Sequence, residues 1–163
     1  MKKYIISFIF TLITAASMNA QKTPGYVPLA SFNKDTLQYL ITNFENQKAK
    51  YIGKPIGMIF YDLELEIKGN LPLQQSPRNK KYLAGVILKF YNVNLYRTLS
   101  LEKQRTFYKD MKNYAIYIET EVPQNRADYL SLLRQEVNIN WSNNFKSFYS
   151  PYIVKSISTN ATP

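Results

Sequence analysis

The stretch YLAGVILKFY, residues 82–91, decides the fold class of this chain. Nearly every position in it is apolar, β-branched or aromatic, which is typical of a central β-strand. Gly85 interrupts the stretch at some cost in stability, but a strand tolerates it. We therefore expect a sheet built around these residues.

Three further segments have the two-residue period of a half-buried strand. Residues 63–67 alternate leucine and isoleucine with acidic residues, residues 114–122 alternate with equal regularity, and residues 152–157 predict a last strand. Residues 69–81 (GNLPLQQSPRNKK) are polar and contain two prolines, so they predict a loop. The acidic residues of the strands are expected to face solvent.

Helical periodicity appears on both sides of these strands. Asn33 is predicted to cap a first helix that ends before Gly53, and Pro55 begins a short second helix. Asn125 is predicted to cap a third helix that carries Tyr129 and the leucines after it. The sequence thus predicts an α+β fold with two N-terminal helices followed by an antiparallel sheet of about four strands with a further helix.

The predicted organisation comprises a signal peptide (1–20), an extended N-terminal arm (21–31), a single α+β domain (32–158) and a polar tail (159–163). Within the domain, residues 92–113 are ambiguous, with Ser100 as the cap of a possible helix through Met111. Residues 137–149 mix aromatic with polar residues and predict no particular element.

The first twenty residues indicate export. Lys2 and Lys3 precede an apolar run from Ile5 to Ile13, and small or polar residues follow as far as Ala20. Because a bilayer core needs ~20 apolar residues, the run is too short for a membrane span. We expect a periplasmic or secreted protein that has no transmembrane span once the leader is removed.

The composition restricts the chemistry. The chain has no cysteine and no histidine, so no disulfide, no nucleophile paired with histidine and no imidazole metal ligand is available. We assign no catalytic residue, no cofactor-binding residue, no cofactor and no metal. The alternative is a carboxylate-dependent glycan-processing enzyme, for which the acid pairs Glu64 with Glu66 and Glu119 with Glu121 would be the candidates.

Positive charge is concentrated in residues 78–112. The whole chain has a formal net charge of +10, and this segment contains only two acidic residues, Glu102 and Asp110. Its basic residues are Arg78, Lys80, Lys81, Lys89, Arg97, Lys103, Arg105, Lys109 and Lys112. Aromatic residues lie among them, as in many anion or glycan sites. The candidate partner-binding residues are Arg97, Lys103, Arg105, Tyr108, Lys109 and Lys112.

Two hypotheses follow from these observations. The favoured one is a non-enzymatic binding or scaffolding domain of the bacterial envelope or extracellular space, which engages an anionic partner through the basic face 78–112. The partner classes are anionic lipid, acidic glycan and an acidic envelope protein, and export excludes nucleic acid. A solvated basic surface without a partner explains the same charge, and the sequence does not predict the oligomeric state.

Overall fold

A computed structural model describes residues 22–76, 78, 80–90, 98–104, 106, 115–136 and 141–159. The predicted signal peptide, residues 1–20, lies outside these described residues, as does most of the predicted polar tail.

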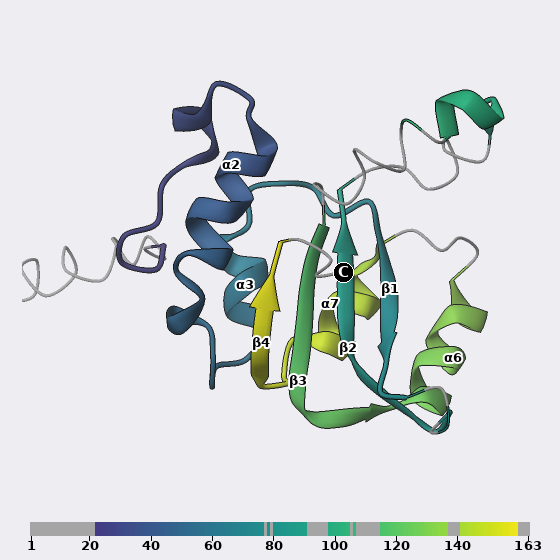
Figure 1. Ribbon diagram of the computed structural model, residues 1–163. Helices are drawn as coiled ribbons and strands as arrows, with labels where there is room; N and C mark the ends of the chain where they lie inside the picture. The colour runs from purple at the N-terminus through teal and green to yellow at the C-terminus, as the bar shows by residue number, and fades with distance from the viewer. Residues whose placement is uncertain are drawn as a thin grey trace, which may run out of the picture.

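The centre of the molecule is a four-stranded antiparallel sheet with the strand order β1-β2-β3-β4 (Figure 1). The strands are β1 (Gly69–Gln74), β2 (Tyr82–Lys89), β3 (Ala115–Asn125) and β4 (Val154–Ser158). The predicted α+β fold is therefore confirmed. The predicted strands at 82–91, 114–122 and 152–157 correspond to β2, β3 and β4.

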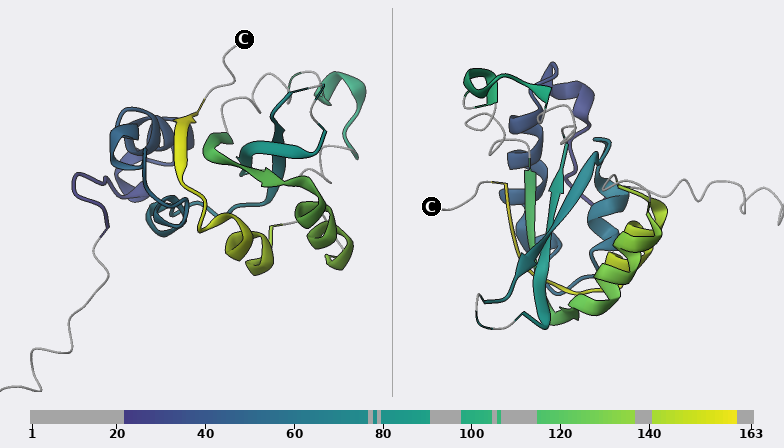
Figure 2. Two further views of the ribbon diagram at one scale, coloured as in Figure 1. Left: turned by 90° about the horizontal axis from the view of Figure 1, so that it is seen from below. Right: turned by 90° about the vertical axis from the view of Figure 1, so that its right-hand side faces the viewer.

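Helices cover the sheet on one side and at its β4 edge. Among the described residues, they are η1 (Leu29–Phe32), α2 (Thr36–Leu40), η2 (Ile41–Glu45), η3 (Lys48–Lys50), α3 (Gly57–Asp62), α6 (Arg126–Gln135) and α7 (Asn143–Tyr149). Figure 2 shows α6 and α7 together on one side of the sheet, with α2 beside β4. The predicted order is wrong in one detail, because two helices rather than one separate β3 from β4.

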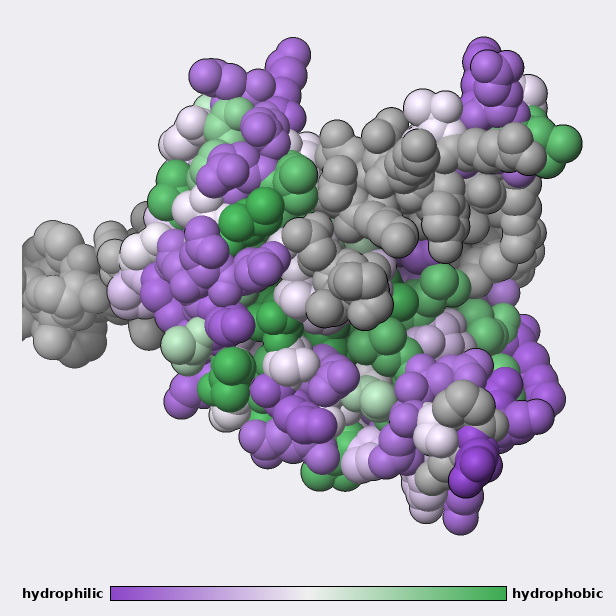
Figure 3. Space-filling view, in the orientation of Figure 1, coloured by the Kyte–Doolittle hydropathy of each residue, from purple (hydrophilic) through white to green (hydrophobic). Residues whose placement is uncertain are grey.

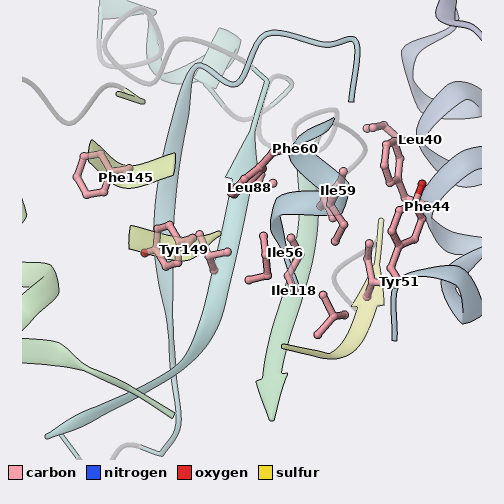
Figure 4. Packing of buried hydrophobic residues seen from close by; sticks show 14 of the residues in the cluster. Leu40, Phe44, Tyr51, Ile56, Ile59, Phe60, Leu88, Ile118, Phe145 and Tyr149 are labelled. Atoms are coloured by element: carbon pink, nitrogen blue, oxygen red, sulfur yellow. The ribbon is translucent and has the colours of Figure 1, made fainter. Parts of the chain in front are cut away.

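Side chains along a strand point alternately to the two faces of the sheet, and the apolar ones lie on the buried face. Val86 lies opposite Ile118, which in turn lies opposite Ile157, and all three are buried. The core extends from them to the helices, where the fully buried side chains include Phe44, Tyr51, Ile59, Phe145 and Tyr149 (Figure 4). One continuous apolar cluster thus joins the N-terminal helices, the sheet and α7.

The two outer strands end the sheet differently. At β4, the Val154 N–H donates to the Lys54 carbonyl and the Gly53 N–H donates to the Val154 carbonyl, both at 2.9 Å. At β1, Pro72 lies within the strand, where its ring removes one backbone donor. The first edge is bound by backbone at its first residue, and the second carries an interrupted row of donors.

Two predictions between the second helix and β2 were wrong. Residues 63–68 belong to no strand, and the predicted loop 69–81 begins with β1. Leu63, Leu65 and Ile67 still pack against the core. The alternation therefore reports an extended segment with one partly buried side, which meets β2 only at Lys68, whose backbone N–H donates to the Lys89 carbonyl at 2.8 Å.

The first helix begins later than predicted. Asp35 is its N-cap, with a side-chain oxygen 2.9 Å from the Gln38 backbone nitrogen, whereas Asn33 has a left-handed backbone with φ 49° and ψ 38°. The predicted cap at Asn125 is confirmed, since its side chain accepts from the Ala127 N–H at 2.9 Å. Gly53, predicted to stop the first helical segment, has φ +74°.

No helix among the described residues has the length and apolar character needed to cross a membrane.

Candidate anion-binding site

The structure describes one of the six predicted binding residues. Lys103 lies in a helical turn at 101–104, is exposed, and donates its backbone N–H to the Ser100 hydroxyl at 3.4 Å. This bond agrees with the predicted cap at Ser100. The other five, Arg97, Arg105, Tyr108, Lys109 and Lys112, lie outside the described residues.

A second group of bases meets at the closed end of the β1–β2 hairpin. The Arg126 backbone N–H donates to the Lys81 carbonyl at 3.0 Å, and its guanidinium donates to the Lys80 carbonyl at 3.2 Å. These bonds hold the first residue of α6 against the hairpin. We call the basic residues at this end of the hairpin, Arg78, Lys80 and Lys81, together with Arg126, the basic end. The surface there is strongly hydrophilic (Figure 3, lower right).

Arg126 was not among the predicted binding residues. It lies 45 residues after Lys81 in the sequence, and the two come into contact only in the folded protein. Conversely, Lys89, which was counted in the predicted basic face 78–112, is half-buried in β2. Burial lowers the pKa of its ammonium group. The basic residues of the segment 78–112 are therefore not all exposed on one face.

A shallow pocket of about 450 Å³, widely open to solvent, lies between α6 and α7. Pockets that hold small ligands have volumes of about 300–1,000 Å³. Its lining combines an aromatic ring and a leucine with a carboxylate, amides and hydroxyls, contributed by Phe148, Leu132, Asp128, Gln135, Asn144, Ser131 and Ser147. Amides and hydroxyls both donate and accept hydrogen bonds, which suits a ligand rich in hydroxyl groups.

The acidic residues are dispersed among the described parts of the chain. Glu119 is exposed on β3 and forms an ion pair with Lys155 at 3.5 Å, and Glu66 forms an ion pair with Lys68. Glu64 accepts a hydrogen bond from the Leu29 backbone N–H at 2.9 Å. Within the described residues, Asp128 is the one carboxylate that lines the pocket, and no group of three or more acidic side chains is placed to hold a metal ion.

A polar site that the sequence did not predict binds residues 22–32. These residues overlap the predicted arm (21–31), and we call them the arm from here on. Asp62 is fully buried and accepts from the Thr23 backbone N–H at 3.1 Å and from the Tyr51 hydroxyl at 2.9 Å. Asn43, 1% exposed, accepts from the Val27 N–H at 2.8 Å and donates to the Val27 carbonyl at 2.9 Å. The body of the protein thus binds the arm through its main chain.

Aromatic rings complete this attachment. Tyr39 is fully buried, its hydroxyl lies 2.8 Å from that of Tyr26, and its ring contacts Tyr26 and Phe32 edge to face. Burial raises the pKa of the hydroxyls of Tyr26 and Tyr39. We call Tyr39, Asn43, Asp62 and Glu64 the arm dock.

The lone tryptophan has a packing role. Trp141 contacts Phe60 at 5.2 Å between ring centroids and lies parallel to Tyr149 at 6.3 Å. Its ring is thus held against the apolar cluster. Sequence and fold comparisons give no independent assignment of any of these sites: no family model, no curated protein and no solved structure matches the chain.

Proposed function

We propose that this chain is an exported, non-enzymatic binding domain of the bacterial envelope or extracellular space, and that its partner is an acidic glycan. The observation that carries the proposal is the basic end, where the bonds from Arg126 to the Lys80 and Lys81 carbonyls place a further basic residue beside those of the hairpin. Such a group attracts polyanions through its summed field. The leader-like sequence at residues 1–20 supports export.

The pocket favours a glycan over the other anionic partners. It is lined from α6, the helix whose first residue is Arg126, and offers Phe148 with amide and hydroxyl groups. An aromatic ring beside such groups suits the apolar face and the hydroxyls of a sugar. A glycan-processing reaction needs two carboxylates about 5–9.5 Å apart, and the described lining of the pocket provides Asp128 alone.

Binding of the full chain to an immobilised acidic polysaccharide tests the proposal, with a neutral polysaccharide and phosphatidylglycerol vesicles as comparisons. We expect binding to the acidic polysaccharide at low salt and roughly tenfold weaker binding once the Debye length falls to ~8 Å. Equal binding to the neutral polymer would overturn the role of charge. Binding to vesicles alone would replace the glycan by a membrane surface.

Charge reversal identifies the responsible residues. Arg78→Glu with Lys80→Glu should weaken binding roughly tenfold, whereas Lys48→Glu with Lys54→Glu makes the same change in net charge at exposed residues away from the hairpin. Reversal of Lys103, Arg105 and Lys109 tests the rest of the stretch 78–112. Surface charges contribute little to folding, so the thermal midpoints should agree. Equal losses from all three variants would indicate nonspecific attraction.

A further inference from the structure

We propose that the pocket between α6 and α7 takes an uncharged sugar unit, so that the glycan bound by this chain alternates acidic sugars with neutral ones. The acidic units lie against the basic end, and Asp128 selects the neutral unit in the pocket. This inference rests on the proposed function and narrows its ligand class. The side chains that line the pocket and the place where α6 begins carry it.

Two helix faces form the walls of the pocket. On α6 the lining residues are 128, 131, 132 and 135, and on α7 they are 144, 147 and 148. Residues three and four positions apart lie on the same face of a helix, so each set forms one continuous stripe. From residue 128 to residue 135 a helix rises by about 10 Å. Because the pocket is open to solvent, one unit of a long polymer can lie in it while the polymer continues beyond it.

The fixed charge in the pocket is negative. Asp128 is exposed and supplies the one carboxylate among the described lining residues, none of which is a lysine or an arginine. An acidic sugar placed there sets a second carboxylate against Asp128, with no base in the lining to compensate. Repulsion between two like charges about 4 Å apart in water lowers an affinity about fivefold. The pocket therefore disfavours an acidic sugar.

A neutral sugar fits the same lining. Its hydroxyl groups can donate to the Asp128 carboxylate and can exchange hydrogen bonds with the Gln135 and Asn144 amides. Hydrogen bonds to an ionised group are stronger than those between neutral groups. Phe148 offers an apolar ring face, and Tyr152 packs against it at 5.7 Å between ring centroids. Burial, and after it the Asp128 carboxylate, raises the pKa of the Tyr152 hydroxyl, which places that carboxylate near this aromatic pair.

Positive charge begins at the same end of α6. Arg126 is the first residue of the helix and is bound to the Lys80 and Lys81 carbonyls. Asp128 comes two residues later, about 3 Å farther along the helix axis. A glycan that lies along the start of α6 therefore meets bases and a carboxylate within a short distance. This arrangement matches a polymer of alternating acidic and neutral sugars better than one in which every sugar is acidic.

Two polysaccharides of different charge pattern test the inference. Hyaluronan alternates an acidic sugar with a neutral N-acetylated one, whereas polygalacturonate has a carboxylate on every sugar. Attraction to the basic end alone favours polygalacturonate, because its density of negative charge is higher. The pocket predicts the reverse order, so the full chain should bind hyaluronan more tightly. Biolayer interferometry on the two immobilised polymers at one ionic strength measures both dissociation constants.

Variants in the pocket should change the ratio of the dissociation constant for polygalacturonate to that for hyaluronan. Asp128→Asn removes the negative charge, so the ratio should fall about fivefold. Ser147→Asp adds a second carboxylate from α7, so the ratio should rise about fivefold. Glu121→Gln is the matched control, because it makes the same change in net charge as Asp128→Asn at an exposed residue of β3 outside the pocket lining. Its ratio should equal that of the wild type.

The outcomes separate this inference from the proposed function. A wild-type ratio above one, shifted in the expected direction by at least one pocket variant and not by Glu121→Gln, supports the neutral sugar unit. A wild-type ratio at or below one, a ratio that neither pocket variant shifts, or an equal shift in Glu121→Gln overturns it while binding to an acidic glycan stands. Binding to neither polymer overturns the proposed function, and the inference with it.

Discussion

Asp62 binds two segments that are far apart in the sequence. Its two carboxylate oxygens accept from the Thr23 N–H in the arm and from the Tyr51 hydroxyl after η3, and its own carbonyl lies 3.4 Å from the Tyr39 hydroxyl. Because Asp62 is fully buried, water cannot replace a partner that is removed. The side chain therefore contributes to stability through satisfied hydrogen bonds rather than through apolar contact.

Asp62→Ala should lower the free energy of unfolding by about 2–4 kcal/mol, since it leaves the Thr23 N–H and the Tyr51 hydroxyl without their acceptor. Asp62→Asn should cost less, because a carboxamide still offers one oxygen and can donate to Tyr51. Urea unfolding followed by circular dichroism measures both variants. Glu66→Ala, at an exposed ion pair, is the control and should change stability by less than about 1 kcal/mol.

Equal effects of Asp62→Ala and Glu66→Ala would contradict the role assigned to Asp62.

The pairing of β2 with β3 depends on Gly85. The register shifts between Leu83 and Gly85, and the Ala84 carbonyl in this irregularity accepts from the Thr120 hydroxyl at 3.1 Å. A Cβ at Gly85 would lie 1.9 Å from the Ile118 carbonyl oxygen and 2.9 Å from the Glu119 Cα. The two strands approach so closely here that only glycine fits.

Gly85→Ala should therefore destabilise the protein by about 3 kcal/mol or more, because the atoms in the way belong to the backbone of β3 and cannot rotate aside. Gly57→Ala is the matched control, since its Cβ would meet Ser150 at 3.5 Å, an ordinary contact, and alanine favours the helix. Thermal unfolding of both variants measures the difference. Similar midpoints would mean that β2 and β3 are not in this register.

The pattern of apolar residues predicted three of the four strands, because β2, β3 and β4 bury residues that the sequence shows directly. It did not predict β1, whose sequence GNLPLQ has the composition of a loop and becomes a strand through its pairing with β2. Pairing with a distant segment is a non-local effect that local composition does not contain. The same reason applies to the basic end, which requires contact between Arg126 and Lys80.

The arm dock was missed although a trace of it exists in the sequence. Asp62 follows the apolar helical positions Ile59 and Phe60 and precedes Leu63, so a carboxylate stands where a buried face is expected. Its partner Thr23, however, comes from a segment rich in proline and glycine that gave no periodic signal.

Buried tyrosines are distributed along the described part of the chain, from Tyr39 in α2 to Tyr149 at the end of α7. Burial raises the pKa of Tyr51 and Tyr149, and it raises that of Tyr129 to about 12. An unfolded chain ionises its tyrosines near pH ~10. Above that pH the unfolded state binds fewer protons than the folded state, so stability must fall as pH rises.

Ionisation of tyrosine should not change the free energy of unfolding below about pH 10. Above about pH 10 it should make the free energy of unfolding fall as the pH rises. Tyr129 contributes between about pH 10 and about pH 12, so Tyr129→Phe should reduce the slope there by up to about 1.4 kcal/mol per pH unit. Urea unfolding at a series of alkaline pH values measures the slopes. An identical slope in the wild type and in Tyr129→Phe would contradict the burial of that hydroxyl.

The two edge strands of the sheet, β1 and β4, affect how readily the protein can form fibrils. A fibril lengthens when one chain offers an unbroken row of backbone groups on which the next chain adds a strand. In this molecule Lys54 and Gly53 bind the backbone of Val154 at the start of β4, and Pro72 breaks the row along β1. Among the described residues, the start of β4 and the middle of β1 are therefore poor templates for the addition of a strand from another chain.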